Sequence, residues 1–329
     1  MLVSSSKPPT EEGTRPVLDP HSLVQLDADV PQLDGVVLVH ALSGFVDAGA
    51  GVRLAREHLL DTLEHRVVAR FDIDQVLDYR ARRPLMTFVE DHWEDYAEPT
   101  LELHLVHDEA GTPFLLLAGP EPDIQWERCV AAVASLIERF GVRLTVGLTA
   151  IPMAVPHTRP IGVTAHATRR ELTAGRQTWV STVAVPASIG HLLEWRLGEA
   201  GKDAIGFAVH VPHYVAQIDY PGAAVALLKS VAEASGLVLP TEELAAAAEQ
   251  TLAQVEEQVR GSDEVAAVVH GLEAQYDAYV GARSGLNLLA ADGSSLPTAD
   301  ELGAELERFL ADQARRDPGE PGPLDPPGR

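Results

Sequence analysis

Two short segments carry the residue types best suited to proton transfer or anion binding. One is Pro156-His157-Thr158-Arg159-Pro160, and the other is His210-Val211-Pro212-His213-Tyr214. A histidine can exchange a proton near neutral pH, and an arginine can hold a carboxylate or phosphate through paired hydrogen bonds. Each segment follows an apolar run typical of a buried strand. We therefore expect both at the carboxyl edge of a sheet, where open α/β folds bind ligands.

Three roles fit these histidines: structural hydrogen bonding, a ligand or catalytic site, and coordination of a divalent metal with a nearby carboxylate. His210 and His213 are three residues apart, but Pro212 between them favours an extended or turned backbone over a helix face. We therefore expect no metal ion and no cofactor. The structural and ligand-binding roles both stay open, and no complete catalytic signature points to an enzyme.

Two further loops add candidates at the same edge. The loop Gly44–Gly51 has glycines suited to close ligand approach, but it lacks the Lys and Ser/Thr of a phosphate loop and fails the dinucleotide pattern. We expect Asp47 to cap the helix that follows, and Asp123 to cap a helix starting at Ile124. Capping does not explain Glu121, which is a candidate base or ion-pair partner. The candidate pocket thus has six residues: Asp47, Glu121, His157, Arg159, His210 and His213.

The charge of the chain limits its partners. Its 329 residues include 25 Lys and Arg against 49 Asp and Glu, a formal net charge of −24. Such a protein repels nucleic acids and anionic membrane surfaces, so we expect neither as a partner. The compact basic group is Arg80, Arg82 and Arg83, a candidate anion or intersubunit contact whose alternative is solvated loop charge. The lack of a signal-like or bilayer-length apolar run predicts a cytoplasmic protein.

The middle of the chain alternates strand-like and helix-like runs. This pattern predicts a three-layer α/β domain over residues 35–237, with a mostly parallel or mixed sheet between helices. The expected strands are 36–39, 67–73, 101–106, 114–118, 144–148, 179–185 and 204–209. Helical spacing is expected over 48–63, 126–140, 189–200 and 223–234.

The ends of the chain have a different composition. Residues 1–33 are rich in Pro, Ser, Thr and acidic residues, which predicts a disordered tail. Two apolar helical stripes after Pro240 predict a helical hairpin over residues 240–283. Residues 284–329 are expected to be mostly disordered, with one short helix over 298–316.

Five ordered motifs together resemble the proteasome assembly chaperone family, in its subunit-two type and actinobacterial branch. The resemblance covers residues 35–283 and is carried by Gly44–Gly49, Asp78–Pro84, Gly119–Asp123, Pro156–Pro160 and His210–Tyr214. It implies a phosphorylase/hydrolase-like α/β fold and a non-catalytic chaperone or scaffold. It also implies a homo-oligomer, of which a trimer is one form, with proteasome core subunits as partners.

One departure from the family bears on docking. Members that bind the proteasome often end in a hydrophobic residue, a tyrosine and one more residue, whereas this chain ends Pro326-Pro327-Gly328-Arg329. We therefore expect any proteasome contact to use another surface, such as the hairpin at 241–283. The alternative function is a small-ligand-binding protein or enzyme of the nucleoside or phosphate type, which would use the six-residue pocket.

Overall fold

An eight-stranded mixed sheet forms the centre of the protein. The computed structural model describes residues 18–44, 46–179 and 182–291. The strands follow the order β1-β3-β6-β7-β2-β8-β10-β9 across the sheet. The central strands β7, β2, β8 and β10 are parallel, and the outer pairings are antiparallel. The strands are β1 Val24–Leu26, β2 Val37–Ser43, β3 His65–Phe71, β6 Glu102–His107, β7 Pro113–Pro120, β8 Leu144–Met153, β9 Val163–Ala167 and β10 Ala204–Pro212.

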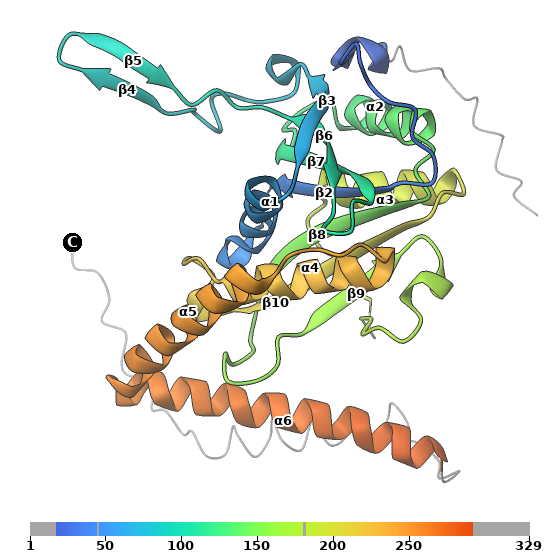
Figure 1. The fold of residues 1–329 in the computed structure, drawn as a ribbon. Coiled ribbons are helices and arrows are strands. Elements are labelled where there is room, and N and C mark those ends of the chain that lie inside the picture. Colours follow the sequence, from blue (N-terminus) through green and yellow to red (C-terminus); the bar gives the residue numbers. More distant parts are fainter. Residues whose placement is uncertain (1–17, 45, 180–181, 292–329) are drawn as a thin grey trace, which may run out of the picture. The chain divides into compact units, whose positions relative to one another are not determined.

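Helices cover both faces of this sheet, which confirms the predicted α/β class (Figure 1). One face packs against α1 (Gly51–Thr62), α4 (Pro221–Ser235) and α5 (Glu242–Arg260). The other packs against α2 (Trp126–Arg139) and α3 (Ile189–Glu199). The last described helix is α6, Asp263–Ala291. The described chain divides into two units after Glu273, and the sheet belongs to the first.

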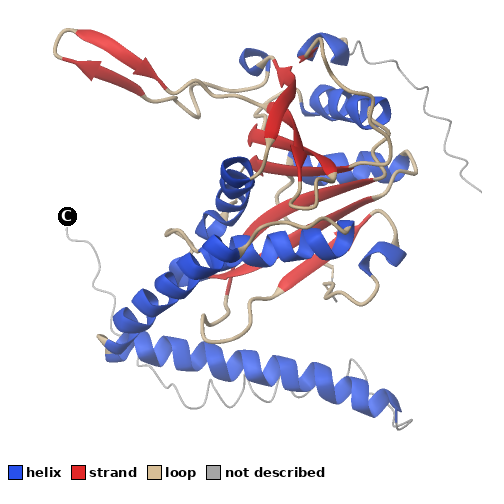
Figure 2. Ribbon diagram, viewed as in Figure 1, coloured by secondary structure: helices blue, strands red, loops and turns tan. Residues whose placement is uncertain are grey.

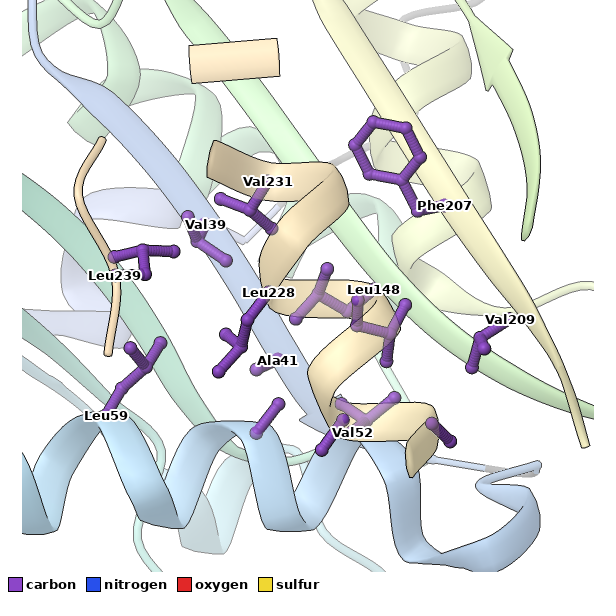
Figure 3. Packing of buried hydrophobic residues seen from close by; sticks show 14 of the residues in the cluster. Val39, Ala41, Val52, Leu59, Leu148, Phe207, Val209, Leu228, Val231 and Leu239 are labelled. Atoms are coloured by element: carbon purple, nitrogen blue, oxygen red, sulfur yellow. The ribbon is translucent and has the colours of Figure 1, made fainter. Parts of the chain in front are cut away.

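The core under α1 and α4 follows from strand alternation. In β2, Val39 and Ala41 point to this face, where they meet the helical stripe that includes Val52 and Leu59 (Figure 3). Leu228 of α4 completes the contact, and all five side chains are 1% exposed or less. Burying one such aliphatic side chain stabilises the fold by about 2 kcal/mol. The alternate strand residues point to the opposite face, under α2 and α3.

Four strands were not predicted, among them the sheet-edge strand β9, and one predicted strand is wrong. Residues 18–33 are not a tail throughout, because β1 pairs with β3 and Leu23 is buried beside it. The strands β4 (Met86–Val89) and β5 (His92–Tyr96) form a separate two-stranded sheet. The described part of 179–185 is a loop between β9 and α3 (Figure 2). The Trp179 side chain in this loop is half exposed. The apolar residues of the loop face a cavity rather than a neighbouring strand.

The C-terminal region follows the predicted helices in part. The helix α6 continues to Ala291, past position 283, where the sequence predicted its end. The predicted helix at 298–316 and the first seventeen residues of the predicted N-terminal tail lie outside the described residues. Among the helices that the structure describes, none combines the length and apolarity needed to cross a membrane.

Candidate functional site

A cavity of about 440 Å³ lies between the sheet and α3, on the face opposite the α1–α4 core. It covers the carboxyl-terminal parts of β2 and β8, the position that ligands occupy in open α/β sheets. Its apolar wall includes Leu42, Ile151, Met153, Trp179, Val183 and Val185. Its polar groups include His40, Glu121, Thr164, His166, His191 and Glu194.

Small residues on the central strands make room for the cavity. In β8, Leu144, Val146 and Leu148 belong to the core on the α1–α4 face, while Gly147 and Thr149 alternate with them and line the cavity. In β10, Ala208 lines the cavity between two large residues of the opposite core. Because side chains alternate along a strand, the large ones face the α1–α4 core and the small ones leave room on the cavity side.

His40 is, with Glu121, one of the two most deeply buried polar groups that line the cavity. Its side chain comes from β2, it is 7% exposed, and its ring lies between two glycines. A methyl group on Gly147 would lie 2.6 Å from His40 Nε2, and one on Gly190 would lie 2.8 Å from Cε1. Burial, with the nearby His191 and His166, lowers the pKa of His40 to about 4. The ring is therefore neutral near pH 7.

His166 and His191 lie beside each other at the other side of the cavity. Their ring centroids are 5.6 Å apart, and His166 Nδ1 lies 2.9 Å from Glu194 Oε2. Burial is the main cause that lowers the pKa of His191, and His166 lowers it further. Within residues 18–44, 46–179 and 182–291, no group of three or more His, Cys, Asp or Glu is arranged to hold a metal ion.

Glu121 joins the loop after β7 to the start of α3. The Ile189 N–H donates a 2.7 Å hydrogen bond to Glu121 Oε1, and Ser188 accepts from the His191 N–H. A carboxylate at a helix N-terminus satisfies a free N–H and interacts favourably with the helix dipole. A Cβ at Gly44 would collide with the Glu121 carboxylate, so Gly44 is needed for this approach. Glu121 therefore caps a helix distant in sequence and also lines the cavity.

Arg82 joins the loop after β2 to the loop after β7 beside the cavity. Its guanidinium donates to the carbonyl oxygens of Ser43 and Glu121 and forms an ion pair with Asp123. Asp123 also accepts from the Asp78 N–H at 2.8 Å. The prediction that Asp123 caps the next helix is therefore wrong, since α2 begins at Trp126 and Asp123 binds Arg82.

The Gly44–Gly51 loop makes close contacts with its own protein. Gly49 has φ +63°, and a Cβ there would lie 2.7 Å from the Tyr220 side chain. Asp47 accepts from the N–H groups of Val52 and Arg53 at 2.8 and 3.0 Å, which confirms its predicted capping role. Burial raises the pKa of Asp47 despite these two donors.

The two histidine segments contact each other, but not through the cavity. His157 Nδ1 lies 2.6 Å from the Tyr214 hydroxyl, and the exposed His213 ring packs against Tyr214. Burial is the main cause that lowers the pKa of His157. Arg159 lies 3.3 Å from Glu273, which also accepts from Thr158.

His210 has a separate structural partner. Its Nε2 lies 2.8 Å from the Thr164 hydroxyl, and burial lowers its pKa. Of the six residues in the predicted pocket, Glu121 is the one that lines the cavity in the part of the chain that the structure describes. The other five contact other residues elsewhere, so the six do not form one pocket.

The cavity residues His40, His166, His191 and Glu194 were not singled out from the sequence. The useful signal was His40 itself, a lone histidine within the apolar run Val36–Leu42. The alternation of large and small residues in Leu144–Thr149 was a second signal. Together they indicate a strand face with space in front of a buried imidazole.

Comparisons with known proteins agree with this architecture. A model of the PAC2 family matches residues 41–259. A solved Mycobacterium tuberculosis protein of unknown function, Rv2714, is 52% identical, with a TM-score of 0.78 over 81% of this chain and 92% of that chain. A Corynebacterium glutamicum protein of unknown function is 40% identical, with a TM-score of 0.76 over 78% and 98%.

A third solved structure has a functional name. The Mycobacterium tuberculosis proteasome-assembly chaperone homologue Rv2125 is 26% identical, with a TM-score of 0.66 over 71% of this chain and all of that chain. No functionally curated protein matches significantly. The family match covers most of the sheet and its helices, and the resemblance predicted from five motifs is confirmed: this chain belongs to the PAC2 family.

Proposed function

We propose that this chain is a proteasome-assembly-chaperone-like protein that works as a non-catalytic homo-oligomer. Membership of the PAC2 family and the likeness to Rv2125 support the chaperone role. The partners proposed on this basis are core subunits of the proteasome. The observation that carries the protein-binding role is an exposed apolar arm, formed by residues 85–97.

The arm is a small two-stranded sheet with a large exposed apolar surface. Its two strands form their own sheet, and Phe88 and Trp93 pack edge to face with centroids 5.0 Å apart. Phe88 is 55% exposed, Trp93 61% and Met86 49%. An isolated two-stranded hairpin is marginally stable in water, and aromatic side chains of this kind are enriched in interface cores. We propose that the arm packs against a second copy of this chain.

The chaperone role is tested by affinity purification of the tagged full chain from its native host. We expect proteasome core subunits to co-purify, and deletion of the protein to slow assembly of the core particle. Failure of both observations would contradict the chaperone role while leaving the family assignment intact.

The arm is tested by exchanging one exposed tryptophan. Trp93→Ser should weaken self-association by about 2 kcal/mol, or roughly thirtyfold, because interface tryptophans often contribute this much. Trp195→Ser is the matched control, since Trp195 is 68% exposed but lies on α3. Sedimentation velocity over a concentration series measures the association constants. Equal association constants for Trp93→Ser and wild type would contradict the proposal that the arm forms the interface.

A further inference from the structure

The cavity under α3 contains a buried polar group that is not engaged in hydrogen bonding with the described residues. His40 is 7% exposed, lines the cavity, and is held between Gly147 and Gly190. None of the hydrogen bonds among the described side chains includes its imidazole, although a neutral imidazole has one donor and one acceptor. Because the ring lines the cavity, its donor and acceptor can face a group bound inside it.

The size and wall of the cavity indicate a small organic molecule. A volume of about 440 Å³ lies in the usual range for ligand sites. The wall is apolar on two sides, with Ile151 and Met153 from β8 and with Trp179 and Val185 from the loop before α3. An apolar ligand body would remove these surfaces from water, which favours binding.

The charged groups that line the cavity argue against an ionic ligand. No Lys or Arg is among the described residues that line it, while Glu121 and Glu194 would repel an anion. A cation would have to compete with the donors that both carboxylates already hold, the Ile189 N–H at Glu121 and His166 at Glu194. Moving an ion into an apolar site without a new partner is costly.

We infer that this cavity binds an uncharged, largely apolar small molecule of aromatic-ring size, whose single hydroxyl, carbonyl or amide group forms a hydrogen bond with His40. The site is distinct from the arm and does not depend on the proposed chaperone role. The ligand body contacts Ile151 and Met153 of β8 together with Trp179 and Val185. The polar group of the ligand points toward the imidazole.

Binding can be measured with one ring system bearing different head groups. 2-Naphthol, naphthalene-2-sulfonate and 1-naphthylmethylamine are neutral, anionic and cationic near pH 7.5. Calorimetric titration of the full chain should show saturable binding of 2-naphthol with a Kd below about 100 μM. We expect the two charged analogues to bind at least about tenfold more weakly. Absence of saturable 2-naphthol binding up to about 1 mM, or equal binding of a charged analogue, would overturn the inference.

Two variants locate the ligand. Ala208→Phe should fill the cavity from β10 and weaken 2-naphthol binding about tenfold or more. Ala246→Phe, on an exposed position of α5, is the matched control and should bind like wild type. Circular dichroism and thermal unfolding establish that both variants fold. Wild-type affinity in a folded Ala208→Phe protein would place binding elsewhere.

The role of His40 is tested with a pair of neutral ligands. 2-Naphthol should bind wild type about three- to tenfold more tightly than 2-methylnaphthalene, the usual effect of one neutral hydrogen bond. His40→Leu should abolish this difference without abolishing 2-methylnaphthalene binding. A merely structural role of His40 would weaken both ligands equally and leave their ratio unchanged, which would overturn the proposed contact.

Discussion

His40 shows how burial sets the chemistry of one side chain. An ordinary histidine has a pKa of 6.5, whereas burial with His191 and His166 nearby lowers the pKa of His40 to about 4. Between these pH values the unfolded chain binds a proton that the folded chain does not bind at this site. His40 therefore lowers the free energy of unfolding as the pH falls from 6.5 toward 4. Above pH 6.5 this loss is absent.

Replacement of His40 should reduce the loss of stability that occurs as the pH falls from 6.5 to 4. The difference between the two pKa values corresponds to about 3 kcal/mol, so His40→Gln should lose about that much less stability than wild type between pH 6.5 and 4. Urea unfolding at several pH values measures this slope. His213→Gln, at an exposed ring, is the control variant. Parallel profiles for His40→Gln and wild type would contradict the prediction.

Arg82 and Arg80 differ in their contacts although they are near neighbours in sequence. Arg82 donates to two backbone carbonyls and pairs with Asp123, whereas the Arg80 side chain is exposed. Arg82→Leu should lower the free energy of unfolding by about 1–3 kcal/mol, because it removes partners from half-buried acceptors. Arg80→Leu should change it by less than about 0.5 kcal/mol. Chemical denaturation of both variants tests this contrast, and equal effects would contradict it.

Local rules predicted single residues only where their partners were local. Asp47 was identified as a cap because the helix it caps begins four residues later. Asp123 was misassigned because its partner Arg82 is distant in sequence. The Tyr214 contact with His157 also joins separate loops. Contacts between residues so far apart in the sequence cannot be predicted from the spacing of residues along the chain.

At the scale of elements, α3 depends on a carboxylate from another loop. Glu121 accepts the Ile189 N–H, and this N–H would be buried without its partner if the carboxylate were removed. Glu121→Ala should therefore cost about 2–3 kcal/mol of stability, and Glu121→Gln, which keeps an acceptor, about 1 kcal/mol. Hydrogen exchange of the first amides of α3 should accelerate most in the alanine variant. Equal exchange in both variants would contradict the capping role.

Hydrophobic periodicity predicted the central elements well and the peripheral ones poorly. The strands β2, β7, β8 and β10 are buried and apolar, so their runs stand out in the sequence. The arm strands β4 and β5 are exposed and were missed. The run 179–185 has the apolar content of a strand, but Val183 and Val185 line the cavity instead. Apolar content alone does not tell a strand from a loop that covers an apolar cavity.

At the scale of the whole molecule, charge and the proposed interface act in opposite directions. Each copy carries a formal charge of −24, so two copies repel each other over distances comparable to the Debye length. The arm presents apolar and aromatic side chains, whose burial does not depend on opposite charges, beside four exposed carboxylates, Glu90, Asp91, Glu94 and Asp95. Self-association through the arm should therefore be opposed by electrostatics at low salt.

Raising sodium chloride from about 50 to about 500 mM should strengthen association severalfold, because the Debye length falls from above 10 Å to below it. Sedimentation velocity at fixed protein concentration measures the change, and Trp93→Ser should stay the weaker associator at both salt concentrations. An interface built on ion pairs, for example between Arg80 or Arg83 and acidic groups of the other copy, would respond in the opposite sense. Association that weakens with salt would therefore contradict an apolar arm interface and favour the basic group.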